Sequence, residues 1–379
     1  MTYPIPNVTQ QTAERAIRPF ISGHVHEALH IASTDPNYAG PILARWFRNN
    51  RKLGSRDRKI VAELAYTLIR YEDWFLQTGL LDAPIHEHSD LQTVLNWLHA
   101  PSVISITQFD LQTHLSIPAS MADEWLKIVP DPELFATHYQ SRAPIDLRVN
   151  GHRIDRSTVV RKLTQHGISC HSIPNVRWGI RIPEPVNVLS LGLYKQGLIE
   201  IQDAASQLFL EKIHQRYPSP HTILDFCAGA GGKSLGLAAQ GHTVFAHEPR
   251  SNARDELQKR AQRAGVSIQN TLPNELVDLV IVDAPCSGTG RLRREPTLRW
   301  RWRTEPPSSW VATQTEILKQ AQAYCKPDGR IIYATCSLIQ AENNHTLPGY
   351  NTERFTIWGH QEACDGFSWT IFTPQGNSL

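Results

Sequence analysis

From about residue 222 onward, the sequence alternates short apolar runs with longer amphipathic segments. Runs rich in β-branched residues predict four buried strands, and an amphipathic stretch before the last of them predicts a helix. The strands are expected at Ile223–Phe226, Thr243–Ala246, Val277–Val282 and Ile331–Ala334, and the helix at Ala312–Ala323. Such alternation is typical of a doubly wound, mostly parallel sheet of the α/β class.

Two of the predicted strands lead directly into a cysteine. Cys286 lies in the segment Asp283–Gly290, and Cys336 follows Ile331–Ala334 after one threonine. Because neighbouring parallel strands point their carboxyl ends at the same crevice, both thiols should meet near one site, together with Asp283. A free cysteine is most often a small buried hydrophobe. The position at strand exits, beside small and hydroxyl residues, favours covalent chemistry instead.

The remaining cysteines predict neither a metal site nor a disulfide framework. No Cys-x-x-Cys pair occurs among the six cysteines, which fits a reducing compartment. His26 and His30 formally match a His-Glu-x-x-His helix, but no third ligand follows at a recognised spacing. The first residues, Met1–Pro6, lack the basic and apolar regions of a signal peptide, and no apolar stretch is long enough to cross a bilayer. We therefore predict a cytoplasmic protein without a metal ion.

Positive charge is concentrated in one segment. The net charge of the chain is only +2, so the whole molecule is not a basic surface for nucleic acid. Six arginines fall between residues 291 and 303, interleaved with Trp300 and Trp302. Guanidinium groups bind phosphate, and both side-chain types stack on unpaired bases, so RNA contact is predicted. The alternative is that the segment packs inward, with its arginines paired to Glu295 and Glu305.

A glycine-rich turn follows the first predicted strand. The turn, Cys227–Ser234, offers small residues and the free N–H groups of the next helix to a ligand. A phosphate-binding Walker loop would need glycine at Cys227, and a dinucleotide fingerprint would need glycine or alanine at Ser234. Glu248 closes the second strand, where a carboxylate can accept hydrogen bonds from both hydroxyls of a ribose. Together these features favour S-adenosylmethionine as the cofactor.

The chain should contain three domains. Residues 1–136 are predicted to be helical, with apolar stripes such as the one that begins after Ser55. Residues 137–210 predict a small α+β unit similar to an RNA-recognition motif. Residues 211–379 contain the predicted parallel sheet and the cysteine motifs.

The stretch from Arg142 to the C-terminus resembles the bacterial RNA cytosine-5 methyltransferases, specifically the small-subunit ribosomal RNA methyltransferase B group. The segments that carry the resemblance are Gln202–Ser206, Asp283–Gly290, Arg293–Trp300, Ala334–Leu338, Glu342–Asn343 and Asp365–Phe367. The helical N-terminal region resembles the NusB-like RNA-binding domain of that group more weakly. The resemblance implies a Rossmann-like class I methyltransferase domain after an RNA-recognition-motif-like unit.

The resemblance also implies a covalent mechanism. Cys336 would attack C6 of a cytosine, which turns C5 into a nucleophile, and Asp283 would hold N3. Cys286 would assist release of the product, and Lys233 would orient Asp283. An exocyclic-amine methyltransferase instead carries an aromatic residue where this chain has Cys286, and it leaves Cys336 unexplained. An inactive RNA-binding scaffold would not need either thiol.

The resemblance assigns further residues to cofactor and RNA. Cofactor contacts are expected from Cys227, Ala228, Gly229, Ala230, Gly231, Gly232, Lys233, Glu248, Asn270 and Asp283. RNA contacts are expected from Arg291, Arg293, Arg294, Arg299, Trp300 and Arg301. Asn270 occupies the position of the family's aspartate beside the adenine, and the chain between it and Asp283 is short. Small-subunit ribosomal RNA is the expected substrate, with transfer RNA as the alternative, and a monomer is expected.

Overall fold

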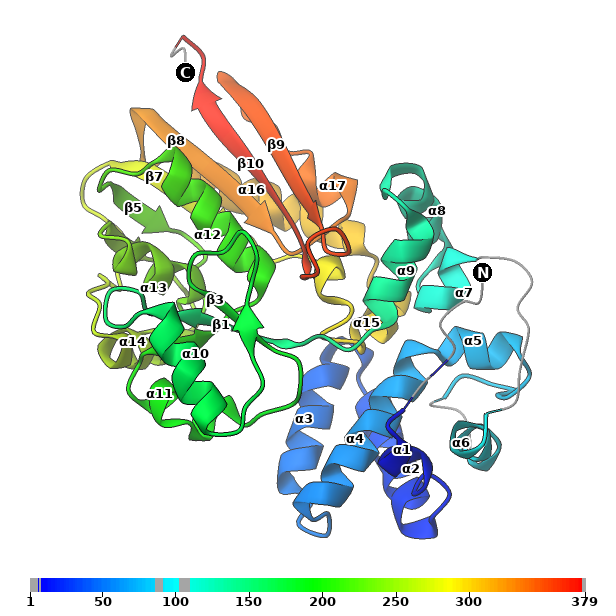
Figure 1. The fold of residues 1–379 in the computed structure, drawn as a ribbon. Coiled ribbons are helices and arrows are strands. Elements are labelled where there is room, and N and C mark those ends of the chain that lie inside the picture. Colours follow the sequence, from blue (N-terminus) through cyan, green and yellow to red (C-terminus); the bar gives the residue numbers. More distant parts are fainter. Residues whose placement is uncertain (1–5, 7, 86–90, 102–109, 377–379) are drawn as a thin grey trace. The chain divides into compact units, whose positions relative to one another are not determined.

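The computed structural model describes residues 6, 8–85, 91–101 and 110–376 (Figure 1). It divides into two compact units, one made of residues 1–142 and 291–309 and the other of residues 143–290 and 310–379. The predicted domain boundaries differ from this division in two respects. The helical unit continues past residue 136 and includes 291–309, and the two predicted α/β-containing domains form a single unit. The signal-peptide prediction concerns residues that lie mostly outside the described part.

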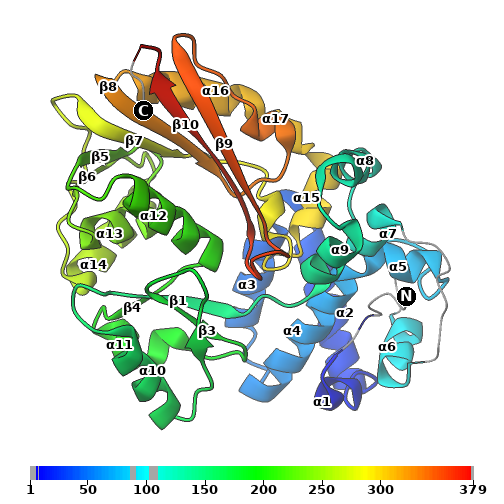
Figure 2. The same cartoon turned by 45° about the horizontal axis from the view of Figure 1, so that its top comes forward.

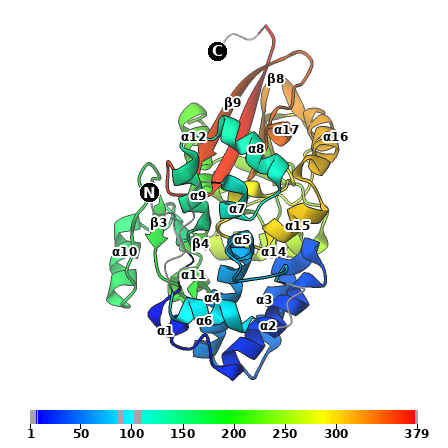
Figure 3. The ribbon, with the colours of Figure 1, turned by 90° about the vertical axis from the view of Figure 1, so that its right-hand side faces the viewer.

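The first unit is helical throughout its described residues. Its helices are α1 (Gln10–Ala13), α2 (Pro19–Ser33), η1 (Pro36–Tyr38), α3 (Ala39–Asn49), α4 (Ser55–Arg70), α5 (Glu72–Gln77), α6 (Gln92–His99), α7 (Leu111–Leu115), α8 (Ala119–Ile128), α9 (Pro132–Gln140) and α15 (Leu298–Thr304). Helix α4 buries the predicted stripe, which confirms its helical spacing: Ile60, Val61, Leu64, Ala65, Leu68 and Ile69. Figure 3 shows α2, α3 and α4 in blue as neighbours, with α15 in yellow against α3.

The second unit begins with a small antiparallel sheet. Its strands have the order β2-β3-β1-β4, with β1 in the middle paired to both β3 and β4. The elements of this part are β1 (Ile145–Val149), α10 (Arg156–Gln165), β2 (His171–Ser172), β3 (Gly179–Ile182), η2 (Val188–Ser190), α11 (Gly192–Lys195) and β4 (Ile199–Ile201). Asp146 joins this sheet to the next helix, because its carboxylate accepts the backbone N–H of Ala204 at 3.1 Å.

The main sheet has six strands in the order β6-β5-β7-β8-β10-β9. Strands β6, β5, β7 and β8 are parallel, while β10 runs antiparallel to both of its neighbours. The elements are α12 (Ala204–Arg216), β5 (Thr222–Asp225), α13 (Gly232–Ala239), β6 (Thr243–Ala246), α14 (Ser251–Ala264), β7 (Val277–Asp283), η3 (Thr289–Arg291), η4 (Pro307–Trp310), α16 (Val311–Gln322), β8 (Cys325–Thr335), α17 (Gln340–Asn343), β9 (Tyr350–Trp358) and β10 (Gly366–Pro374). The predicted Rossmann-like α/β class is confirmed.

Helices cover both faces of the main sheet (Figure 2). Alternate residues of each strand point to opposite faces. Thus Leu279 and Ile281 pack with α12, α13 and α14, while Val280 and Val282 pack with α16. This two-sided burial explains why β7 is a nearly continuous apolar run. Strands of that kind end abruptly at polar residues, which is where Asp283 lies.

Beyond β6, the main sheet has only an isolated bridge in place of a further strand among the described residues. The segment after α14 forms only an isolated parallel bridge between Phe245 and Gln269, with the N–H of Ala246 bonded to the carbonyl of Gln269 at 2.8 Å. The short connection to β7 leaves no room for a longer strand. Among the described residues, no helix has the length and apolar character needed to span a membrane.

Candidate active site

The two predicted thiols meet at the carboxyl ends of β7 and β8. Cys286 Sγ lies 3.4 Å from Cys336 Sγ, both side chains are half-buried, and both are thiols rather than members of a disulfide. The adjacent strands pair in register, with Asp283 opposite Ala334, so the two following loops leave the sheet together. The contact with Cys336 and burial raise the pKa of the Cys286 thiol well above its usual value.

A buried carboxylate fixes both cysteine loops. Glu342, at the start of α17, accepts the N–H of Ser287 at 3.0 Å and the hydroxyl of Ser337 at 3.0 Å. Gln314 of α16 donates to the same carboxylate at 2.9 Å. Burial raises the pKa of Glu342, although these donors oppose the rise. Since Ser287 and Ser337 directly follow the two cysteines, Glu342 holds the thiols in register; the sequence motif contained this residue but gave no signal of its role.

The polar edge of the site includes a short ion pair. Lys233 Nζ lies 2.5 Å from Asp283 Oδ2, and the Asp283 side chain remains 33% exposed. Lys233 also lies 5.0 Å from the ring centroid of Phe367, so its charge is held between an acid and an aromatic face. The prediction that Lys233 lies beside Asp283 is thus confirmed by geometry. An exposed carboxylate beside a fixed cation is available to a ligand.

Asp225 is a buried acid at the end of β5 that the sequence did not single out. Its carboxylate accepts the hydroxyl of Ser234 at 2.6 Å, while its other oxygen has no hydrogen-bond partner. Burial raises the pKa of Asp225 to about 6. The acid therefore lies beneath the glycine-rich turn and titrates near neutral pH.

The glycine-rich turn has the backbone that its sequence predicts. Gly229 and Gly231 have φ of 54° and 81°, in the left-handed region that favours glycine, and Gly231 caps the start of α13. Glu248 is 5% exposed and accepts the N–H of Gly229 at 3.0 Å. The guanidinium of Arg250 also donates to Glu248, at 2.7 Å, and lowers its pKa. A ribose would therefore compete with the Arg250 side chain, which is 70% exposed.

Asn270 lies at the isolated bridge beside β6, the position expected to face an adenine. Its side-chain oxygen is buried and has no hydrogen-bond partner. Unpartnered buried polar atoms are rare in folded proteins and mark places where a ligand or water completes the bonding. Together, the open turn, the buried acid and the unpartnered amide oxygen fit a nucleoside-containing cofactor.

The other cysteines have structural surroundings. Cys325 and Cys364 are buried, and burial raises the pKa of the Cys325 thiol to about 12. Burial raises the pKa of Cys227 as well, although this residue belongs to the glycine-rich turn. In the part of the chain that the structure describes, no group of three or more His, Cys, Asp or Glu side chains could hold a metal ion.

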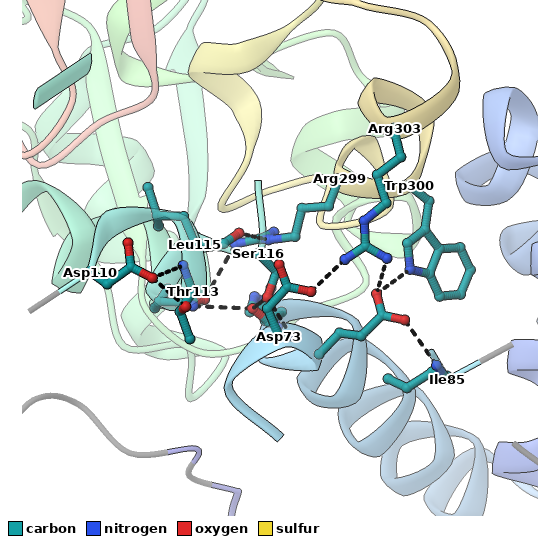
Figure 4. A network of polar contacts seen from close by, with 12 residues as sticks. Asp73, Ile85, Asp110, Thr113, Leu115, Ser116, Arg299, Trp300 and Arg303 are labelled. Carbon is teal, nitrogen blue, oxygen red and sulfur yellow. Dashed lines mark hydrogen bonds and ion pairs between the residues drawn. The ribbon is translucent and has the colours of Figure 1, made fainter. Parts of the chain in front are cut away.

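The burial of Arg293, Arg299 and Trp300 argues against the predicted RNA contact at these three side chains. Arg299 is fully buried and Trp300 is 3% exposed, both inside the first unit. Arg299 donates to the carbonyl of Leu115, and Arg303 reaches Asp73 at 2.7 Å (Figure 4). Glu72 accepts from Trp300 at 2.9 Å and from Arg303 at 2.8 Å. The inward-packing alternative therefore holds for these side chains.

The remaining arginines of the segment differ in how much of each side chain is exposed. Arg293 is 4% exposed and contacts His138 at 2.7 Å, so it too is removed from an RNA surface. Arg291 pairs with Glu295 at 2.9 Å and keeps 45% of its side chain exposed, whereas Arg301 pairs with Glu305 at 3.0 Å and keeps 20%. Arg294 is half-buried. The two expected glutamate pairs are thus present, and Arg291 is the most accessible member among those predicted to bind RNA.

Comparisons with known proteins match two segments of the chain to models of one methyltransferase family. Residues 216–354 match the family model described as 16S rRNA methyltransferase RsmB/F, and residues 118–189 match the ferredoxin-like domain of RsmF/B-like methyltransferases. Ribosomal RNA small subunit methyltransferase B of Vibrio vulnificus is 32% identical over 282 residues, which cover 66% of each chain. The Cronobacter sakazakii protein of the same name is 30% identical over 221 residues. That match covers 55% of this chain and 51% of the relative, about half of the relative's length.

A solved structure supports the fold. The crystal structure of PH0851 is 18% identical, covers 97% of this chain and 99% of its own, and has a TM-score of 0.72.

Proposed function

Since this chain belongs to the RsmB/F family of methyltransferases, we propose that it transfers a methyl group from S-adenosylmethionine to C5 of a cytosine in RNA. The observation that carries the proposal is the pair of thiols 3.4 Å apart at the ends of β7 and β8, beside the Lys233–Asp283 ion pair. The names of the relatives favour small-subunit ribosomal RNA as the substrate.

Cys336 is the proposed nucleophile. Cytosine C5 is a poor nucleophile, so a bond from the Cys336 sulfur to C6 must first push the ring electrons toward C5 and N3. The Cys286 thiol, whose pKa is raised, lies 3.4 Å from the Cys336 sulfur and can donate a hydrogen bond to it. Such a hydrogen bond would stabilise the thiolate form of Cys336. The assignment of Cys336 rather than Cys286 as the nucleophile follows the family resemblance.

Asp283 holds the edge of the cytosine ring in this proposal. Negative charge develops on N3 as the sulfur adds to C6, and a proton held between N3 and the Asp283 carboxylate neutralises it. Lys233, 2.5 Å from Asp283, fixes the orientation of the carboxylate. Once C5 carries the methyl group, water takes the C5 proton, the C–H electron pair restores the C5–C6 double bond, and the Sγ–C6 bond breaks to return Cys336 as a thiolate. Cys286 lies beside the departing sulfur and assists this release.

The cofactor would lie between the glycine-rich turn and the end of β6. The turn 227–233 offers its backbone, Glu248 offers an acceptor for ribose hydroxyls, and the unpartnered oxygen of Asn270 suits the adenine amino group. S-adenosylmethionine would supply an electrophilic methyl group at this place.

A labelled-methyl transfer assay tests the proposal. The purified chain is incubated with radiolabelled cofactor and RNA from small ribosomal subunits that lack the modification, and the RNA is then digested to nucleosides. We expect the label in 5-methylcytidine. Label in an N4-methylated cytidine would contradict the covalent mechanism, and label only in transfer RNA would replace the substrate while keeping the chemistry.

A further inference from the structure

A cavity of about 290 Å³ lies within the second unit, between the small antiparallel sheet and helices α12 and α13. Its wall includes parts of β1, the loop before β3, and one face of each helix. None of the residues that form the thiol pair, the Lys233–Asp283 ion pair or the turn 227–233 contributes to this wall. The cavity is therefore separate from the residues of the proposed active site.

The charges around the cavity favour an anion. Arg148 and Arg177 line it, together with His152 and His214, and Glu211 is the single acid among the lining residues. Arg148 cannot move freely, because its guanidinium donates to the carbonyl of Gly232 at 3.0 Å. Guanidinium groups bind phosphate oxygens with paired N–H donors. The positive wall therefore suits a phosphate-bearing ligand.

The same wall presents planar groups. The guanidinium of Arg177 lies 5.0 Å from the ring centroid of Trp178, in a cation–π contact. The backbone of Gly151 approaches the Trp178 ring so closely that an added Cβ would lie 2.2 Å from it. The ring is thus held against the main chain rather than free to rotate. Aromatic rings and guanidinium planes of this kind stack on unpaired nucleobases.

We propose that this cavity binds one unpaired nucleotide of the RNA substrate, other than the cytosine that is methylated. The proposal rests on the proposed function, because it assumes that the chain acts on RNA. The cavity volume is near the lower end of the range for small-molecule sites, about 300–1,000 Å³, which limits the occupant to one nucleotide. Arg177 contacts the phosphate, and the Arg177–Trp178 pair stacks on the base.

Binding of a short fluorescein-labelled single-stranded oligoadenylate, followed by anisotropy, tests the proposal. Three variants change the site in different ways: Trp178→Ala removes the ring, Arg177→Ala removes an exposed cation, and Ala239→Phe fills the cavity. We expect each to weaken RNA binding about tenfold, the effect of removing one stacked base. Trp178→Phe should retain most of the affinity. Arg161→Ala, an exposed arginine on α10 outside the cavity wall, is the matched control and should leave affinity unchanged.

Two outcomes would overturn the proposal. One is that Arg177→Ala and Ala239→Phe both bind oligoadenylate as the unaltered protein does, with unchanged melting temperatures. The other is that adenosine monophosphate binds the unaltered protein and not these variants while RNA affinity stays constant, since the cavity would then serve a free nucleotide. Failure of the proposed function is distinguishable, because it appears as absence of methyl transfer by the unaltered protein even where the cavity variants bind RNA more weakly.

Discussion

The two cysteine loops and the arginine-rich segment are both prominent in the sequence, but they differ in how accessible their side chains are in the structure. The cysteines come together at 3.4 Å and stay half-buried at the end of the sheet. In the arginine-rich segment, Arg293, Arg299 and Trp300 are buried within the first unit. The cysteines remain accessible to a substrate, whereas these three side chains serve the packing of the helices.

The difference follows from what positions each group. Residues that directly follow parallel strands are placed by the sheet itself, so Cys286 and Cys336 could be located from the sequence. A run of arginines has no such constraint, because the partners that neutralise it are distant in sequence. Glu72 and Asp73, which pair with Arg303, lie more than two hundred residues away. A run of charged residues in a sequence is therefore a weaker predictor of an RNA-binding surface than a residue at the end of a parallel strand is of an active site.

The largest expected effect concerns the thiol pair. Cys336→Ala should lower methyl transfer by a factor on the order of 10⁴–10⁶, since this thiol is the proposed nucleophile at C6. Cofactor affinity, measured by calorimetry, should not change because the thiol contacts only the base. Cys170→Ala, which changes a half-buried cysteine just before β2, is the matched control. Appreciable turnover by Cys336→Ala would remove this residue as the nucleophile.

The arginine-rich segment should respond in stability rather than in RNA binding. Replacing Arg299 and Arg301 together by alanine leaves buried acceptors of the first unit without their donors, and should lower the unfolding free energy by about 3–5 kcal/mol. Arg291→Ala removes a mostly exposed ion pair and should cost at most about 1 kcal/mol. Chemical denaturation measures both.

The salt dependence of RNA binding can contradict the prediction that these arginines serve only stability. If an arginine neutralises a phosphate of single-stranded RNA, its removal should reduce the slope of log affinity against log salt by about 0.7. A flatter slope in the Arg299, Arg301 double variant, with unchanged stability, would restore the RNA-contact interpretation of this segment.

The buried acid beneath the glycine-rich turn gives a pH prediction. The pKa of Asp225 is raised from 3.8 to about 6, so the folded state binds its proton more tightly than the unfolded state. Stability is therefore greatest at low pH with respect to this group, falls as pH rises from 3.8 to about 6, and stays reduced above. Asp225→Asn should remove that loss and raise the unfolding free energy at neutral pH by roughly 3 kcal/mol at most. An unchanged pH profile would mean that the acid is not desolvated.

The smallest effect is expected at the ribose position. Glu248→Ala should weaken S-adenosylmethionine binding by about 1–3 kcal/mol, the cost of leaving hydroxyl groups without a charged acceptor. Arg250→Ala is the comparison variant. It removes the guanidinium that competes for Glu248, so it should not weaken S-adenosylmethionine binding. Unchanged affinity in Glu248→Ala would place the ribose contact elsewhere.

The sequence predicted four strands of the six-stranded main sheet and the proximity of the two thiols, because both depend on local pattern and sheet topology. Periodicity located β6 at its observed residues and β7 within one residue. It could not show that the segment near Gln269 forms only a bridge, since that depends on the length of the connection to β7. Nor could it reveal the role of Glu342, whose partners Ser287 and Gln314 come from two other elements. Polar contacts between residues that are far apart in the chain do not produce a periodic pattern in the sequence.

The central claim is that Cys336 forms a covalent bond to the base and Cys286 assists its release. The most direct test is Cys286→Ala incubated with substrate RNA and S-adenosylmethionine, then separated under denaturing conditions. We predict a protein–RNA species that survives denaturation and is absent when Cys336→Ala is added to the same chain. If RNA binds and no such species forms, or if the species persists without Cys336, the assignment of the two thiols is contradicted.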